Sequence, residues 1–411
     1  MTKNEAGRPE LKRALNLPML TLYGLGTTIG AGIYALLGEI AGTAGYGAPF
    51  SFLIASLLAA FTACSFAELA ARFPRAAGAA LYVQKGLGTE RLSTVVGLLV
   101  VASGLVSSAA LVNGFQGYLQ EFVELDRTIA IPAICAALAA IAAYGIVQSV
   151  TVAAAITVVE IGGLILVIAV GADNFAALPE RWPLMLPGTA TTSWVGVLMG
   201  VSLAFYAFIG FEDMVDLAEE VKNVRLNMPR GILLTLGITT VLYFVLMISA
   251  LLALTPEELA ASSAPMARLF EAGTGNTSML ISVIALFAII NGALIQLVMV
   301  SRVLYGLGSR RKLPQWFARV NPKTRTPLVA TLTAAGVLFV LALSGHLAAL
   351  AKTTSLLMLT IFMLVNLALW RIKSTEAQAP DDLPTFPRIV PAMGALLSGL
   401  FVLRELSTRL F

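Results

Sequence analysis

Residues 23–38 read YGLGTTIGAGIYALLG, an apolar stretch that carries no charged side chain and contains five glycines. A helix that is interrupted inside a membrane leaves backbone N–H and C=O groups that lipid cannot pair. Such a break is tolerated only where it faces protein or a water-filled cavity. The stretch therefore predicts a membrane-spanning segment that is discontinuous near Gly30, with a binding site beside the break.

The rest of the chain is equally apolar. Of its 411 residues, 58% are hydrophobic and 12% are charged, and the mean hydropathy is +0.87. An average soluble domain has about 25% charged residues, so these values exclude a soluble protein. Because about 20 apolar residues span a bilayer as a helix, we predict an all-α integral membrane protein with about 11 spans, at residues 17–40, 48–72, 91–118, 129–147, 151–172, 191–217, 230–254, 277–305, 327–345, 349–370 and 389–405.

The basic residues predict the orientation of these spans. All but six of the 27 Lys and Arg residues lie in the N-terminal tail or in connections on the same side of the membrane as that tail. Because cytoplasmic connections carry the excess of Lys and Arg, we expect a cytoplasmic N-terminus in the cell (inner, cytoplasmic) membrane. The net charge of +4 then reflects topology and requires no nucleic-acid partner.

Motifs for catalysis and metal binding are missing from the sequence. His346 is the single histidine, and Cys64 and Cys135 lie inside apolar runs. No HExxH, GxSxG or GxxxxGK(S/T) string occurs, so the sequence does not contain the residues usual for zinc, haem or P-loop chemistry. We therefore expect no metal, no cofactor and no enzyme activity.

A second glycine break lies in the sixth predicted span. Residues 202–220 read SLAFYAFIGFEDMVDLAEE, in which acidic residues closely follow Gly210. Spans one and six open two successive five-span halves, and because five is odd, the halves insert with opposite topology. Broken segments at corresponding positions of inverted halves mark the central site of a transporter. Close packing between helices would explain either glycine cluster alone, but their equivalent positions favour a site.

This organisation divides the chain into four parts. Residues 1–16 form a cytoplasmic tail, 17–172 the first repeat, 191–371 the second repeat, and 388–411 an additional C-terminal span. The N-terminus of a half-helix offers N–H groups to an anion, and the C-terminal end of the facing half-helix offers C=O groups to a cation. A zwitterionic amino acid presents both charges.

The same stretches resemble a known family. Residues 27–34 (TTIGAGIY) resemble the first-span signature of the amino acid, polyamine and organocation (APC) transporter superfamily, and residues 205–213 (FYAFIGFED) resemble its sixth-span signature. Residues 65–83, 218–232 and 301–330 are similar to further motifs of the family, in the family's order. The resemblance is greatest to the cationic amino acid transporter branch and its bacterial relatives.

The resemblance implies the five-plus-five inverted-repeat transporter fold, with discontinuous spans 1 and 6. The backbone of the first break would hold a substrate carboxylate, carbonyl groups of the second break would hold the ammonium, and the Phe208 ring would cover the substrate from outside. Most relatives have twelve spans, and here a twelfth is missing from the sequence. The implied substrate contacts are Ile29, Gly30, Ala31, Gly32, Phe205, Phe208, Ile209 and Gly210.

Glu160 lies near the middle of the fifth predicted span. A carboxylate there costs about 2.5–3.5 kcal/mol by insertion scales unless it is protonated or paired. Proton-coupled relatives carry a lysine at the matching position. We predict that Glu160 carries the coupling proton, and the alternative is a structural glutamic acid that donates one hydrogen bond to a neighbouring helix.

Four further polar positions call for an interpretation. We expect Asn291, in the eighth span, to contact the substrate, although a hydrogen bond between helices would also explain it. We expect Glu68 and Arg72 to form an ion pair near a helix end. We expect Asp216 to pair with a basic residue at the inner interface, and the alternative is that it lines the cytoplasmic exit path.

The predicted function is secondary active transport of small or medium neutral L-amino acids by alternating access, through proton symport or exchange for a second amino acid. Around the breaks the sequence offers Gly, Ala, Ile and Phe, which supply no counter-charge for a cationic side chain. Alternatives are a carrier of cationic amino acids, amines or polyamines, and a sensor or channel of the same architecture. The expected partners are the amino acid, protons or a counter-substrate, and the lipid bilayer.

Overall fold

The structure is a computed structural model that describes residues 13–30, 32–74, 78–144, 150–188, 192–276, 279–324, 326–376 and 383–410. No β-strand occurs within these ranges, which contain a single isolated bridge between Leu15 and Val221. The helices are α1 (Leu17–Ile29), α2 (Gly32–Ala44), η1 (Gly45–Gly47), α3 (Ala48–Arg72), α4 (Gly78–Leu87), α5 (Glu90–Leu119), α6 (Arg127–Tyr144), α7 (Val150–Val170), η2 (Ala172–Ala177), α8 (Leu178–Met185), α9 (Trp194–Tyr206), η3 (Phe211–Leu217), α10 (Val224–Ala253), α11 (Pro256–Ala261), α12 (Pro265–Thr274), α13 (Met279–Ser309), η4 (Gln315–Ala318), α14 (Leu328–Ser344), α15 (Leu347–Thr375) and α16 (Ile389–Leu410), where η marks a 3-10 helix.

Every predicted span coincides with a helix, so the all-α membrane fold is confirmed. In the described part of the chain, 8 helical runs are long and apolar enough to cross a bilayer, and α7 makes a ninth if it is counted with the short helices after it, from which it bends by 56°. α1 and α14 are shorter apolar helices, and α2, η1 and α3 count together as one of the long runs, Gly32–Arg72. The repeat boundaries at residues 172 and 191 stay a prediction.

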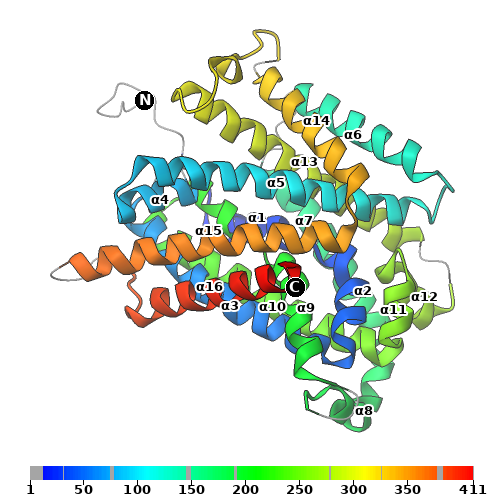
Figure 1. Ribbon diagram of the computed structural model, residues 1–411. Coiled ribbons are helices and arrows are strands. Elements are labelled where there is room, and N and C mark those ends of the chain that lie inside the picture. The colour runs from blue at the N-terminus through cyan, green and yellow to red at the C-terminus, as the bar shows by residue number, and fades with distance from the viewer. Residues whose placement is uncertain are drawn as a thin grey trace.

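The long helices run side by side, and the short helices gather at the two ends of the bundle (Figure 1). α4 lies at one end, while α8, α11 and α12 lie at the other. The span prediction did not include these four helices. A capping box of Thr255 and Glu258 stabilises the start of α11. Thr255 Oγ1 accepts a hydrogen bond from the Glu258 N–H at 3.2 Å, and Glu258 Oε2 accepts one from the Thr255 N–H at 2.8 Å.

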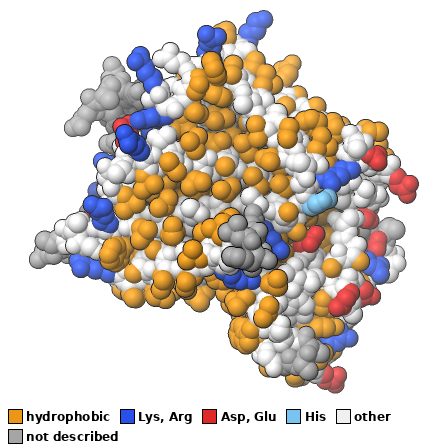
Figure 2. All heavy atoms as spheres, viewed as in Figure 1, with side chains coloured by type: hydrophobic (Ala, Val, Ile, Leu, Met, Phe, Trp, Pro, Cys, Tyr) orange, Lys and Arg blue, Asp and Glu red, His pale blue; other side chains and the backbone are white. Residues whose placement is uncertain are grey.

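The surface separates into an apolar band and charged edges. In the view of Figure 2, hydrophobic side chains cover the middle of the molecule, Lys and Arg gather toward the edge that bears α4, and Asp and Glu gather along the edge that bears α11 and α12. This is the distribution expected of a protein whose central band faces lipid.

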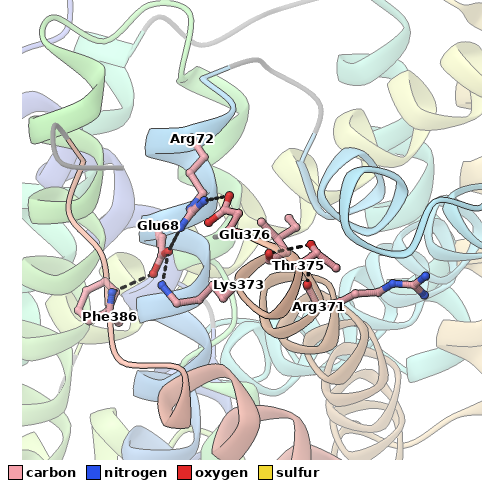
Figure 3. Close-up of polar contacts among 8 residues, drawn as sticks. Glu68, Arg72, Arg371, Lys373, Thr375, Glu376 and Phe386 are labelled. Carbon is pink, nitrogen blue, oxygen red and sulfur yellow. Dashed lines mark hydrogen bonds and ion pairs between the residues drawn. The ribbon is translucent and has the colours of Figure 1, made fainter. Parts of the chain in front are cut away.

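A buried ion cluster joins α3 to α15 at the α4 end of the bundle (Figure 3). Glu68 Oε1 accepts hydrogen bonds from Arg72 Nη2 at 2.6 Å and from Lys373 Nζ at 2.6 Å, and Glu68 Oε2 accepts from the Phe386 N–H at 2.9 Å. Arg72 Nη1 also reaches Glu376 Oε1 at 2.5 Å. The predicted Glu68–Arg72 ion pair is confirmed, and it belongs to a larger cluster that includes the segment before α16.

A second polar contact lies one to two turns further along the same two helices. Asn366 Oδ1 on α15 accepts from Ser65 Oγ at 2.6 Å, and Asn366 Nδ2 donates to Thr62 Oγ1 at 2.8 Å. All three residues are buried. Two adjacent polar contacts therefore fix α15 against α3.

Candidate substrate site

The first break is short. α1 ends at Ile29 and α2 begins at Gly32, and Ala31 lies outside the described residues. Gly30 keeps a backbone hydrogen bond to the Gly26 carbonyl at 3.2 Å. Because α2 begins a new helix, its first-turn N–H groups lack carbonyl partners four residues earlier in the same helix.

The second break is longer and more strongly unwound. α9 ends at Tyr206 and η3 begins at Phe211, with a turn between them. Within the turn, the N–H groups of Ala207 and Phe208 bond to carbonyls three residues earlier, at 3.1 and 3.0 Å. Gly210 has φ +129°, a conformation that side-chain-bearing residues rarely adopt. Its N–H donates to Glu212 Oε2 at 2.9 Å, so the carboxylate that follows the glycine pairs a freed backbone donor.

The two breaks pack directly against each other. Thr27 Oγ1 donates to the Gly210 carbonyl at 2.9 Å, and a Cβ added to Gly210 would overlap the Thr27 carbonyl. A Cβ added to Gly32 would lie 2.9 Å from the Ala207 Cα. These glycines allow backbones that are far apart in sequence to approach within contact distance.

Tyr243 on α10 contacts both breaks. Its buried hydroxyl lies 3.0 Å from the Thr28 carbonyl and 3.1 Å from the Ala207 carbonyl, so it donates to the carbonyl groups of both breaks in turn. The Phe208 ring packs on the same side, 5.3 Å from the Tyr243 ring and 6.3 Å from the Phe52 ring, centre to centre.

A small cavity of about 30 Å³ lies beside the breaks, and Tyr243 does not line it. It opens into a vestibule of about 650 Å³ that extends to the α4 end of the bundle. The two spaces share the residues at their junction, Ser107, Ile209, Asp213, Ile295 and Gln296. The remaining residues around the small cavity are Gly26, Thr27, Thr28, Gly32, Leu111, Tyr206 and Gly292.

The structure brings only some of the predicted substrate contacts to this cavity. Gly32 and Ile209 line it. Ile29, Phe205 and Phe208 are buried and line neither space, and Gly210 is covered by Thr27. The Phe208 ring lines neither space. The substrate-binding role of all these residues stays a prediction.

Tyr206 is the aromatic residue that the sequence reasoning missed. Its ring lines the cavity, and its hydroxyl lies 3.0 Å from Ser107 Oγ and donates to the Ser107 carbonyl at 3.2 Å. This contact joins α9 to α5 across the cavity. Gln296 and Gly292 on α13 also line the cavity, whereas the predicted Asn291 does not.

Glu160 on α7 lies close to the first break. It is 1% exposed, and a Cβ added to Gly30 would lie 3.5 Å from its Oε2. Its carboxyl group lies next to the Asn291 side chain on α13, and among the described residues its oxygens and Asn291 Oδ1 have no other hydrogen-bond partner. The Tyr34 hydroxyl donates to the Glu160 backbone carbonyl at 2.6 Å, which fixes α7 against α2 beside the carboxyl group.

The vestibule carries charge on two sides. Asp213, Asp216 and Glu220 line it from η3 and the residues that follow, and Arg302 lines it from α13. The expected ion pair of Asp216 with a basic residue is absent from the described ion pairs, because its side chain faces the vestibule. Asp213 reaches further and also lines the small cavity.

Comparison with known proteins agrees with this architecture. The chain is 28% identical to the branched-chain amino acid permease BcaP of Bacillus subtilis, over 98% of this chain and 90% of that protein. It is 30% identical to the vacuolar cationic amino acid transporter 4 of Arabidopsis thaliana, over 93% of this chain and 66% of that protein. The crystal structure of MhsT in complex with L-phenylalanine has the same fold, with a TM-score of 0.64 at 13% identity, over 97% of this chain and 99% of that one. The family model described as amino acid permease matches residues 15–404, so the chain belongs to the amino acid permease family of the APC superfamily.

Proposed function

We propose that the chain is a secondary active amino acid transporter that works by alternating access. The observation that carries the proposal is the direct contact of two helix breaks beside a cavity that opens into a vestibule at one end of the bundle. With the N-terminus in the cytoplasm, the vestibule opens to the cytoplasm. The structure then represents the inward-facing state.

In this proposal the peptide groups of the breaks hold the two charges of the amino acid. The N-terminus of α2, at Gly32, offers first-turn N–H groups and the positive end of a helix dipole to the carboxylate. The C-terminal end of α9, at Tyr206, offers carbonyl groups to the ammonium. The Tyr206–Ser107 contact crosses the cavity beside its junction with the vestibule.

The substrate side chain would lie toward α5 and α13. Leu111 and Ile295 supply apolar surface there, and Ser107 and Gln296 supply polar groups. This lining supports a small or medium neutral side chain. The relatives include a branched-chain amino acid permease, which agrees with an apolar substrate.

Asp213 supports the second candidate, transport of cationic amino acids. Its carboxylate lines the small cavity at the junction with the vestibule, where it would pair with a cationic side chain. We expect Asp213→Asn to leave the uptake of neutral amino acids within about twofold of the wild type. If cationic amino acids are the substrates, the variant loses their uptake at least about tenfold, since a charge-assisted hydrogen bond contributes about 1.5–3 kcal/mol.

The experiment that tests the proposed function is a thermal-shift screen of the twenty L-amino acids on the purified protein, followed by uptake into proteoliposomes of each amino acid that stabilises it. A ligand that binds the native state raises the apparent stability. Stabilisation together with concentrative uptake supports the transporter. Stabilisation without uptake indicates a sensor, and ohmic currents far above carrier turnover indicate a channel.

Glu160 is the proposed carrier of a coupling proton, and this gives a separate prediction. We expect Glu160→Gln to abolish accumulation driven by a pH gradient while exchange of labelled for unlabelled substrate continues, because the amide cannot release a proton. Glu160→Asp, which keeps a titratable group, is the matched control and should retain pH-driven uptake. If Glu160→Gln accumulates substrate as the wild type does, Glu160 is structural, and coupling to sodium or to a counter-substrate takes its place.

A further inference from the structure

The vestibule has two walls of opposite charge. Asp216 and Glu220 lie on one wall, and Arg302 and Arg310 lie on the other, on α13. Asp216 and Arg302 are both exposed to the vestibule. Tyr23 on α1 also lines the vestibule. None of the ion pairs found in the described ranges crosses from one wall to the other.

The two walls belong to different packing units. α13 packs along α5, and the ion pair of Lys312 Nζ with Glu90 Oε1, at 2.6 Å, fixes the end of α13 to the start of α5. η3 instead packs mainly on α1, α3 and α10, with a smaller contact to the start of α4, where a Cβ added to Gly78 would lie 3.1 Å from Asp216 Oδ1. The Leu15 N–H donates to the Glu220 carbonyl at 3.0 Å, and the Lys222 N–H donates to the Leu15 carbonyl at 2.8 Å. The start of α1 and the segment after η3 therefore form one unit, which faces α5 and α13 across the vestibule.

We propose that Arg302 and Asp216 form the ion pair that closes the vestibule in the opposite-facing state. This inference rests on the proposed function, since a transporter of this kind must close one side before it opens the other. An arginine fork fits a carboxylate through two parallel hydrogen bonds. The pair strengthens as closure removes water from between the walls, because the local dielectric falls.

The other charged groups of the vestibule have assigned contacts or positions. Lys312 is paired with Glu90, and Glu212 accepts the Gly210 N–H. Asp213 lies deeper, against the small cavity. Asp216 and Arg302 line the vestibule from opposite walls, and both side chains are exposed. Arg310 is also exposed, but it lies beyond the end of α13. Because the Asp216 and Arg302 side chains are separate in the open state, their ion pair stabilises only the closed state. An interaction present in one state and absent in the other shifts the equilibrium between the two states.

The test is a charge-swap experiment in a background where Cys64 and Cys135 are replaced by alanine. Ser103→Cys, a one-atom change on α5 inside the vestibule, reports closure through its rate of labelling by a membrane-impermeant maleimide in purified protein. We expect Arg302→Asp and Asp216→Arg each to raise the labelling rate at least about fivefold, since losing the pair moves the equilibrium toward the open state. The double swap Arg302→Asp with Asp216→Arg should return the rate to within about twofold of the parent, because the pair re-forms with its charges exchanged.

The control variant leaves Asp216 unchanged and exchanges charges with another acidic residue of the same wall: it combines Arg302→Asp with Glu220→Arg. This combination should keep the fast labelling of the single variants. Unchanged labelling in the single variants, no rescue in the double swap, or equal rescue by the Glu220 swap would each overturn the proposal. Labelling requires no substrate, so the charge-swap result stands apart from the thermal-shift screen, and failure of either one can be recognised separately.

Discussion

Replacing Gly32 by leucine is expected to abolish substrate binding while the helical fold stays intact. A Cβ at this position would lie 2.9 Å from the Ala207 Cα and 3.4 Å from the Tyr206 ring, so the larger side chain forces the two breaks apart. The N–H groups of α2 would then no longer face the carbonyl groups of α9. Since a charge-assisted hydrogen bond contributes about 1.5–3 kcal/mol, losing one or two of them should lower the affinity about 100-fold or more. Binding is measured by thermal shift with the substrate that the screen identifies.

Gly237→Leu is the matched control for this variant. Gly237 lies on α10, and no atom lies within 4 Å of a Cβ added there. The same substitution should therefore leave both substrate binding and the circular-dichroism signal of the helices unchanged. If Gly32→Leu binds the substrate with wild-type affinity, the contact between the two breaks is not part of the substrate site.

Replacing Glu68 by alanine should cause the largest loss of stability. Glu68 is 0% exposed and holds Arg72 and Lys373, whose side chains are 5% and 6% exposed. Its removal leaves two buried cations with one carboxylate, Glu376, at the edge of the cluster. Breaking a buried ion pair from one side costs about 3–5 kcal/mol, which we expect as a large fall in the melting temperature of the purified protein.

Glu90→Ala is the control for the Glu68 variant. Glu90 also pairs with a lysine, Lys312, at 2.6 Å, but the two side chains are 68% and 31% exposed. An exposed pair contributes about 0–1 kcal/mol, so the melting temperature should change little. If the melting temperature falls equally in the two variants, the burial of the Glu68 cluster does not determine how much the cluster contributes to stability.

The sequence allowed the helices and the positions of both breaks to be predicted, because these depend on local properties. Long uncharged runs mark the spans, and glycines at equivalent positions of two halves mark the breaks. The left-handed conformation of Gly210 and the close approach of Gly32 to Ala207 show why glycine is required at these points.

The side chains that face the cavity could not be predicted in the same way. Phe208 and Tyr206 are two positions apart in one aromatic stretch, and only the local turn decides which ring lines the cavity and which packs on Phe52. Asp216 was expected to be paired, but its position depends on how far η3 lies from α13. Glu68 was assigned to Arg72 four residues along its own helix, whereas its bond to Lys373 joins segments 305 residues apart, which no local pattern indicates.

The central claim is that peptide groups of two opposed helix breaks hold the charged ends of an amino acid. The most direct measurement is a structure determined by cryo-electron microscopy with the amino acid that gives the largest thermal shift. The account predicts the substrate carboxylate within about 3 Å of the first N–H groups of α2, and the ammonium within about 3 Å of carbonyl groups at the end of α9. Substrate density that lies elsewhere in the vestibule, with the peptide groups around Gly32 and Tyr206 untouched, would contradict it.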